Sequence, residues 1–140
     1  MKVRDLMTRT VTWATPETDC AAAAVKMFEG DCGIVPVVEG EGQLLGVVTD
    51  RDICMAAATR GQPPSHIPVR DLIGGAVASC GPNEEVEGAL ETMAVCKVRR
   101  LPVVDSQGAL IGMFSFSDAL KATGAGPKSK TLKAEPLLKA

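Results

Sequence analysis

The sequence predicts an α+β fold in which two β-α-β-β-α repeats pack as a pseudo-two-fold pair. Three observations lead to this prediction. First, 140 residues can form one domain, or two small repeats that share a core. Second, residues 3–53 align without a gap with residues 69–119, and 15 of the 51 aligned pairs are identical. Third, the hydrophobic patterns of both copies indicate the same order of strands and helices.

The identical pairs define the extent of the two copies. Val-Arg-Asp-Leu at residues 3–6 returns at 69–72, and Pro-Val-Val at 36–38 returns at 102–104. A stretch rich in proline and glycine separates the copies. We therefore expect a first repeat at 1–60, a linker at 61–68, a second repeat at 69–122 and a flexible basic tail at 123–140.

One helix in each copy is predicted by apolar residues at i, i+3, i+4 and i+7, which lie on one helix face. A short extended piece at 11–13 precedes this helix in the first copy, and Pro16 with Asp19 supplies a helix start. The periodic residues are Cys20, Ala23, Ala24 and Met27 in the first copy and Val86, Ala89, Leu90 and Met93 in the second.

A hairpin follows the first helix of each copy. Apolar runs reach a turn with glycine or polar residues and then return, at 34–48 in the first copy and at 98–114 in the second. Pro36 and Pro102 cannot donate a hydrogen bond to a strand ladder, so we expect each at an edge or bulge. The second helix of the first copy is predicted at about residues 50–60.

Charge and hydropathy exclude two classes of partner. Residues 1–120 contain 10 Lys and Arg against 16 Asp and Glu, whereas residues 121–140 contain 5 against 1. An acidic repeat region argues against nucleic acid as the partner. No apolar run approaches the roughly 20 residues that span a bilayer, and the N-terminal residues do not form a signal sequence, so we expect a cytoplasmic protein without membrane contact. The basic tail is either a solubilising end or a contact for a partner.

The cysteines and the histidine do not indicate a metal site. The five cysteines are odd in number and include no Cys-x-x-Cys pair, so we expect mostly buried free thiols. His66 is the only histidine and lies among prolines. No Ser-His-Asp, Cys-His or paired-acid arrangement is visible, so we expect no enzyme activity.

Each copy closes with the pattern Gly-x-x-(Thr/Ser)-x-x-Asp, at 46–52 and at 112–118, after its Pro-Val-Val strand. Together with the openings at 3–6 and 69–72, this pattern resembles a tandem pair of CBS (cystathionine-beta-synthase) domains, the Bateman module, over residues 1–122. The resemblance implies two clefts between the repeats that accept AMP, ADP or ATP, or else NAD or S-adenosylmethionine. It also implies a regulatory module without a required cofactor, which transmits ligand occupancy to another protein.

The resemblance also implies roles for individual residues. Asp52 and Asp118 would hold ribose hydroxyls, and Thr49 and Ser115 would contact ribose or phosphate. Two further groups complete the predicted site: Ile34, Val35, Pro36, Leu101 and Pro102 flank the adenine, and Arg51, Arg99 and Arg100 are the candidates for binding phosphate.

The same acids have a second interpretation. A carboxylate suits two vicinal hydroxyls, and a hydroxyl at a helix start lies beside free N–H groups that favour phosphate. Thr49 with Asp52, and Ser115 with Asp118, are equally typical of capping boxes. The sequence leaves both interpretations open.

Two functions therefore remain. The first is the nucleotide-dependent regulator, and the alternative is a ligand-free structural or dimerisation scaffold. Small residues at 21–24 and 56–58 permit close helix contact. On this ground, and because the family commonly dimerises, we expect a homodimer built from helix faces.

Overall fold

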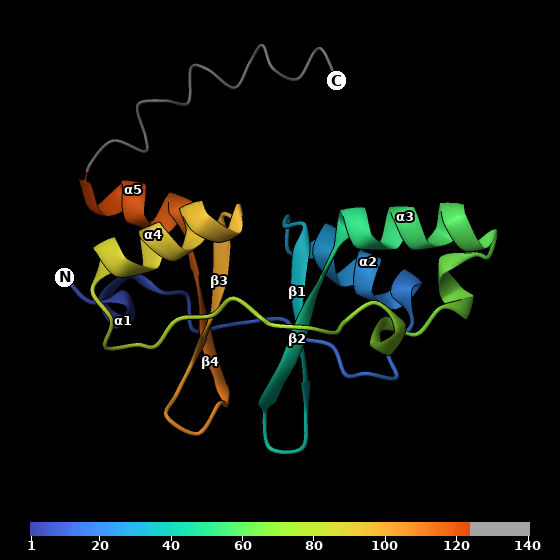
Figure 1. Cartoon of the computed structure of the whole chain (residues 1–140), viewed down its shortest axis with the longest axis horizontal. Helices are drawn as coiled ribbons and strands as arrows, with labels where there is room; N and C mark the ends of the chain where they lie inside the picture. Colours follow the sequence, from blue (N-terminus) through green and yellow to red (C-terminus); the bar gives the residue numbers. More distant parts are fainter. Residues whose placement is uncertain (124–140) are drawn as a thin grey trace, which may run out of the picture.

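The structure, a computed structural model, describes residues 1–123 and contains two similar halves (Figure 1). The tail expected at 123–140 therefore lies, from residue 124 on, outside the described residues. The elements in chain order are α1 Val3–Leu6, α2 Cys20–Glu29, β1 Ile34–Glu39, β2 Gln43–Thr49, α3 Asp50–Arg60, the 3-10 turns η1 Pro64–His66 and η2 Val69–Asp71, α4 Val86–Cys96, β3 Arg100–Val104, β4 Leu110–Ser115 and α5 Phe116–Thr123.

The two predicted hairpins are confirmed as two antiparallel sheets of two strands each, β1–β2 and β3–β4. Val35 lies opposite Val48 in the first sheet, and Leu101 lies opposite Phe114 at the equivalent position of the second. Both registers shift at the same place, after Val37 and after Val103. The duplicated sequence therefore gives two hairpins of equivalent register, each with one apolar face to bury.

In place of the short extended piece expected at 11–13, a single residue of each repeat pairs with the hairpin, Ala14 in the first repeat and Cys80 in the second. The Ala14 N–H donates to the Pro36 carbonyl at 2.9 Å, and the Val38 N–H donates to the Ala14 carbonyl at 2.8 Å. Cys80 makes the same pair of bonds to β3 in the second repeat. Pro36 lacks an N–H, yet its carbonyl still takes part in this pairing.

Each half has its own hydrophobic core, and each core takes residues from both copies of the sequence. Ile67 at the end of the linker and Val69 at the start of the second copy are fully buried among Cys20 and Met27 of the first. Val3, at the start of the first copy, is fully buried in the core of the second. The opening segments are therefore exchanged between the halves, and α1 lies beside α4 and α5 rather than beside α2 (Figure 1).

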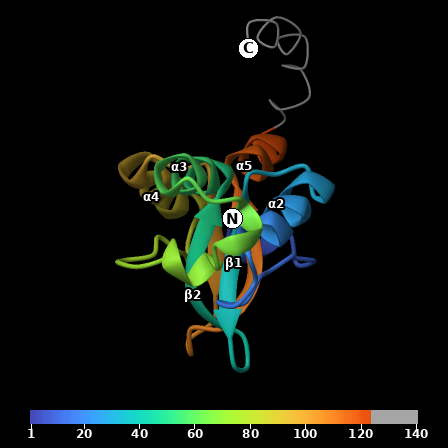
Figure 2. The same cartoon turned by 90° about the vertical axis from the view of Figure 1, so that its right-hand side faces the viewer.

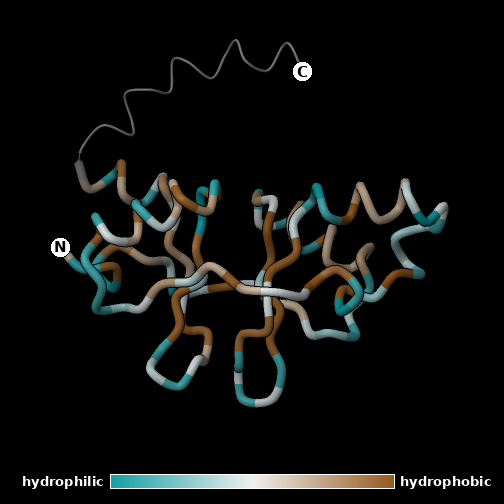
Figure 3. Tube along the Cα trace, viewed as in Figure 1, coloured by the Kyte–Doolittle hydropathy of each residue, from teal (hydrophilic) through white to brown (hydrophobic). Residues whose placement is uncertain are grey.

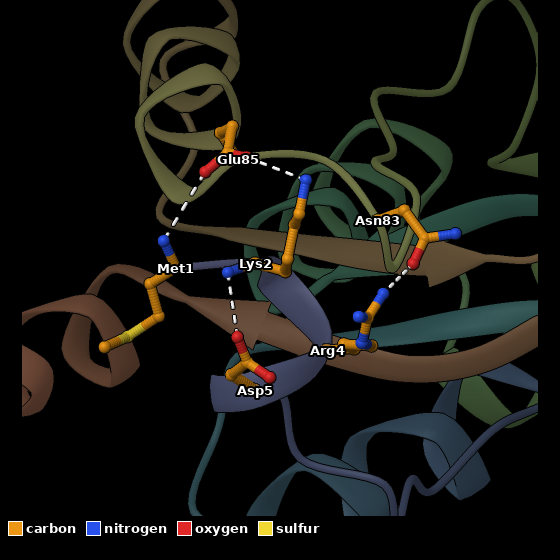
Figure 4. A network of polar contacts seen from close by, with 6 residues as sticks. All are labelled: Met1, Lys2, Arg4, Asp5, Asn83 and Glu85. Atoms are coloured by element: carbon orange, nitrogen blue, oxygen red, sulfur yellow. Dashed lines mark hydrogen bonds and ion pairs between the residues drawn. The ribbon is translucent and has the colours of Figure 1, made fainter.

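Polar contacts fasten the exchanged N-terminal segment to the start of α4 (Figure 4). The Lys2 ammonium lies 2.8 Å from a Glu85 carboxylate oxygen, and Arg4 donates to the side chain of Asn83. These contacts are exposed, so they fix the position of the segment more than they stabilise the fold.

The two hairpin tips are joined. The Leu44 N–H donates to the Gly108 carbonyl at 3.1 Å, and the Leu110 N–H donates to the Gly42 carbonyl at 2.9 Å. Apolar residues occupy the strands and polar residues occupy the tips (Figure 3), and helices lie on both sides of the strands when the molecule is viewed from its end (Figure 2). The pseudo-two-fold arrangement predicted from the repeat is confirmed.

The expectation of mostly buried cysteines was wrong. Cys20 and Cys80 are buried, Cys32 is partly buried, and Cys54 and Cys96 are exposed on α3 and α4. Within residues 1–123, no helix has both the length and the apolar character required to cross a membrane.

Candidate functional site

Two clefts lie between the halves, and a crossing segment of the chain forms a wall of each. Residues 8–12 leave the second half, where Thr8 and Met113 exchange backbone hydrogen bonds of 2.8 and 2.9 Å, and reach β1 through Ala14. Residues 74–78 cross at the equivalent place and reach β3 through Cys80. Both crossings are visible between the hairpins in Figure 1.

We name each cleft after its acid. The Asp118 cleft has a volume of about 360 Å³ and includes Thr8, Ile34, Pro36, Arg100 and Ser115 in its lining. The Asp52 cleft has a volume of about 540 Å³. Both volumes lie within the range of roughly 300–1,000 Å³ typical of small-molecule sites. The lining of the Asp52 cleft includes Ile34, Val47, Ala76, Val98, Arg100 and Pro102.

Both acids belong to capping boxes. The Thr49 N–H donates to Asp52 Oδ2 at 2.9 Å, while Asp52 N–H donates to Thr49 Oγ1 at 3.1 Å. Ser115 and Asp118 make the same two bonds, both of 3.0 Å. Each box therefore holds the acid in one orientation at the start of α3 or α5.

Each capping box uses only one of the two carboxylate oxygens of its acid. Only Oδ2 of each carboxylate accepts a hydrogen bond within residues 1–123, so Oδ1 of Asp52 and Oδ1 of Asp118 keep their acceptor capacity. Capping and ligand binding, which the sequence leaves as alternatives, are therefore compatible: the cap fixes the carboxylate that the cleft presents.

The residues expected to flank the adenine fall into two groups: some line the clefts, and others lie in the hydrophobic cores. Ile34 lines both clefts, Pro36 lines the Asp118 cleft and Pro102 lines the Asp52 cleft. The side chains of Val35 and Leu101 are at most 1% exposed and belong to the two cores. Strand alternation explains the difference, because neighbouring residues point to opposite faces.

The expected hydroxyls also differ between the clefts. Ser115 is 7% exposed and lines the Asp118 cleft. Thr49, at the equivalent position, lies outside the lining of the Asp52 cleft. In the part of the chain that the structure describes, its hydroxyl takes part only in the capping box.

Of the three expected phosphate-binding arginines, the structure brings only Arg100 to the clefts, and Arg100 lines both. The Arg99 guanidinium lies 4.9 Å from the centroid of the Phe116 ring, a cation–π contact outside both linings. Arg51 is exposed on α3 and also lies outside both linings.

Sequence reasoning missed the crossing segment as a source of site residues. Thr8, Thr10 and Thr12 line the Asp118 cleft, and Lys121 of α5 lines it as well. The three threonines stand at alternate positions, and in an extended segment this spacing directs side chains to one side. That spacing was the signal that could have identified them.

Comparisons with known proteins match both halves of the chain. A model of the CBS domain matches residues 3–59 and 66–124. The CBS domain-containing protein YhcV of Bacillus subtilis is 36% identical over 116 residues, which cover 83% of this chain and 81% of YhcV. Homoserine O-acetyltransferase of Methanococcoides burtonii also matches, but over 24% of its own length.

Two solved structures share the fold. Hypoxic Response Protein I with two coordinated zinc ions has a TM-score of 0.79 and 29% identity, covering 86% of this chain and 98% of that one. CBSX2 in complex with AMP has a TM-score of 0.75 and 26% identity, covering 87% and 95%. In the part of this chain that the structure describes, no three His, Cys, Asp or Glu residues are grouped so as to hold a metal ion.

The repeat, the two hairpins and the paired clefts thus accompany a family match to both halves of the chain. This protein belongs to the CBS-domain family and consists of a tandem pair of CBS domains.

Proposed function

We propose that this CBS pair is a regulatory module that binds an adenine nucleotide and transmits its occupancy to a separate partner protein. The observation that carries the proposal is the pair of clefts, each with a carboxylate that a capping box orients and that keeps one free oxygen. The AMP complex of CBSX2, at 26% identity, supports the choice of ligand class. AMP, ADP and ATP are the first candidates, and NAD and S-adenosylmethionine are the others.

The chemistry of the lining fits such a ligand. A free carboxylate oxygen accepts hydrogen bonds from ribose hydroxyls, and bonds of this kind to a charged group contribute about 1.5–3 kcal/mol each. The Arg100 guanidinium can bind a phosphate through two N–H groups. The partly exposed side chain of Ile34 offers apolar surface to the adenine in both clefts, backed by the buried rings of Pro36 and Pro102.

The output of the module requires another protein. Among the described residues, each cleft contains a single carboxylate, and His66 lies outside both linings, so the proposal assigns binding and no catalysis to these sites. A bound ligand changes the relative stability of two arrangements of the module only by its difference in affinity for them. The partner would recognise the favoured arrangement. The free state of all five cysteines supports a reducing compartment, the cytoplasm.

Calorimetric and thermal-unfolding titrations with AMP, ADP, ATP, NAD and S-adenosylmethionine test the proposal, with GMP as the control for base recognition. A ligand at a hundred times its dissociation constant stabilises the native state by about 2.7 kcal/mol. The double variant Asp52→Asn/Asp118→Asn should lose the effect while it keeps an acceptor for each cap. If no adenine ligand binds at millimolar concentration, the proposal fails.

We also propose that two copies of the chain associate through helix faces. Val25 and Phe28 stand one turn apart on α2 and are 53% and 87% exposed, and Met55 on α3 is 50% exposed. The small residues expected at the contact, 21–24 and 56–58, lie on the same two helices. Burying such apolar side chains is favourable by roughly 1.5–3 kcal/mol each.

Light scattering at micromolar concentration tests this association. A dimer should form, and Phe28→Lys should dissociate it, whereas Lys97→Ala, outside these helices, should not. A monomer at every concentration would refute the dimer. Dimerisation with no ligand binding would instead favour the alternative function, a structural scaffold with empty clefts.

A further inference from the structure

The two clefts occupy equivalent positions but differ in chemistry. Thr8, Thr10 and Thr12 of the Asp118 cleft correspond in the repeat to Gly74, Ala76 and Ala78 of the Asp52 cleft. Three hydroxyls in one wall are thus replaced by hydrogen or methyl groups in the other. Ser115 and Ser117 add a fourth and a fifth hydroxyl to the Asp118 cleft, whereas Thr49 stays outside the Asp52 cleft.

The two clefts also differ in the number of cationic side chains in their linings. Arg100 lines both clefts, and Lys121 lines the Asp118 cleft alone. Within residues 1–123, neither side chain has an ion pair or a hydrogen-bond partner. The Asp118 cleft therefore presents two cations against one acid, while the Asp52 cleft presents one shared cation against one acid. Most of the remaining Asp52 lining is apolar and includes Leu72, Ile73, Val77 and Val98.

We propose that the two clefts take different ligands. The Asp118 cleft binds a phosphorylated adenine nucleotide, and the Asp52 cleft binds an adenine nucleoside without phosphate. The inference rests on the proposed function and deepens it. Hydroxyl, ammonium and guanidinium donors in one cleft compensate the desolvation of a phosphate. In the other cleft a phosphate would meet mainly methyl groups, whereas an uncharged nucleoside leaves no buried charge without a partner.

Arg100 connects the two sites. When a phosphate in the Asp118 cleft binds this guanidinium, the positive charge of Arg100 no longer balances the negative charge of Asp52. The lining of the Asp52 cleft is then left with the charge of its acid alone. A second anionic ligand is disfavoured there, while an uncharged nucleoside is not. The coupling is reciprocal, so an anion forced into the Asp52 cleft would weaken nucleotide binding in the Asp118 cleft.

Calorimetry with AMP and adenosine tests the division, because the two probes differ only by the phosphate. On the full chain we expect one high-affinity equivalent of AMP, and one equivalent of adenosine that still binds when AMP is saturating. Raising NaCl from 50 to 500 mM should weaken AMP binding at least several-fold and leave adenosine binding nearly unchanged.

Paired variants assign each probe to its cleft. Asp118→Asn should lower the affinity for AMP at least tenfold more than that for adenosine, and Asp52→Asn should do the reverse. Arg100→Gln should lower AMP affinity at least tenfold. Arg99→Gln is the matched control, since its guanidinium lies over Phe116 and outside both linings; it should leave both affinities unchanged.

The outcomes separate this inference from the proposed function. If neither probe binds, the division of ligands is refuted, and the titrations with ADP, ATP, NAD and S-adenosylmethionine decide whether the proposed function stands. If both probes bind but compete for one site, or if the two Asn variants affect both probes equally, the division of ligands is refuted while nucleotide binding stands. If Arg99→Gln weakens AMP binding as much as Arg100→Gln, the assignment of the shared guanidinium is wrong.

Discussion

At the scale of single residues, Asp52 and Asp118 combine two tasks in one carboxylate. One oxygen caps a helix, with bonds of 2.9 and 3.0 Å to backbone N–H groups, and the other is left for the cleft. A side chain that is already fixed loses little rotamer entropy when a ligand arrives. The two tasks can be separated by substitution, because asparagine keeps one acceptor oxygen and alanine keeps none.

Asp118→Ala and Asp118→Asn should therefore differ in stability. Loss of a cap costs typically about 1 kcal/mol, so we expect this decrease in the free energy of unfolding for the alanine variant and less than about half of it for the asparagine variant. Urea unfolding without ligand measures both. Equal destabilisation would show that charge, and not the acceptor, maintains the helix start.

The cysteines should differ sharply in reactivity. Burial raises the pKa of the Cys80 thiol to about 12 and also raises the pKa of Cys20, so both stay protonated and unreactive at pH 8. Cys54 and Cys96 are exposed. Titration with a chromogenic disulfide reagent should detect these two first, and Cys20 and Cys80 only after unfolding. Rapid reaction of Cys80 in the native protein would contradict the packing described for the second core.

The sequence predicted the acids of the site better than its cations. Asp52 and Asp118 were found because the Gly-x-x-(Thr/Ser)-x-x-Asp pattern ties them to a strand end and a helix start. Arg99 and Arg100 are neighbours on the chain, and their side chains separate only through packing: one lies over Phe116 and the other lines both clefts. The Phe116 ring, which is more than ten residues from Arg99 in the sequence, thus determines which of the two arginines can reach a ligand in the clefts.

At the scale of elements, periodicity predicted the helices and hairpins well. The helix expected at about 50–60 is α3, Asp50–Arg60, and it ends before Gly61, whose positive φ of 62° suits glycine. The short extended piece expected at 11–13 was misplaced, because the first repeat pairs through the next residue, Ala14, and the second repeat through Cys80. Their neighbours continue as the crossing segments, and that path depends on contacts between halves, which local sequence does not encode.

Two glycines should respond in opposite ways to alanine. A Cβ at Gly112 of β4 would lie 2.8 Å from the Thr8 carbonyl oxygen, whereas a Cβ at Gly88 of α4 would meet nothing within 4 Å. Gly112→Ala should destabilise the fold by more than about 1 kcal/mol by displacing the crossing segment. Gly88→Ala should stabilise it by about 0.5–1 kcal/mol through helix propensity. Thermal unfolding of both variants checks the signs, and stabilisation by Gly112→Ala would refute the close approach.

The attachment of the N-terminal segment to α4 should depend on pH. The hydrogen bond from Lys2, followed by the charges of Lys2 and the N-terminal amine, lowers the pKa of Glu85 below 4.5. A lowered pKa in the folded state gives stability that is present above pH 4.5 and is lost as the pH falls through the folded value. The stability difference between wild type and Glu85→Gln should be present at pH 7 and vanish in acid. Glu87→Gln is the control, and an equal effect at pH 7 and in acid would contradict the ion pair.

At the scale of the whole molecule, the exchange of opening segments makes the two repeats one folding unit. The first core contains Val69 from the second copy and Ile67 from the linker before it, and the second core contains Val3 from the first copy. Bonds between the hairpin tips add a further connection. The clefts exist only when both halves are formed, because each wall begins in one half and ends in the other. Loosening of one core should therefore reach both ligand sites.

Val3→Ala is the most direct test of whether the two repeats fold as one unit. Val3 belongs by sequence to the first repeat, but its side chain packs in the second core. Truncation of a fully buried valine should lower the free energy of unfolding by about 2 kcal/mol. Val95→Ala is the matched control, since that side chain is 80% exposed and its loss should change stability by less than about 0.5 kcal/mol.

Two probes report on the two halves during urea unfolding of Val3→Ala. Trp13 fluorescence follows the crossing segment beside Ala14 and the first core, and the accessibility of the Cys80 thiol follows the second core. If the repeats fold as one unit, both midpoints move together, and the transition stays single and coincident. If they fold independently, the Cys80 midpoint moves alone and the Trp13 midpoint stays at its wild-type value. Only the coincident shift is compatible with clefts whose walls are shared between the halves.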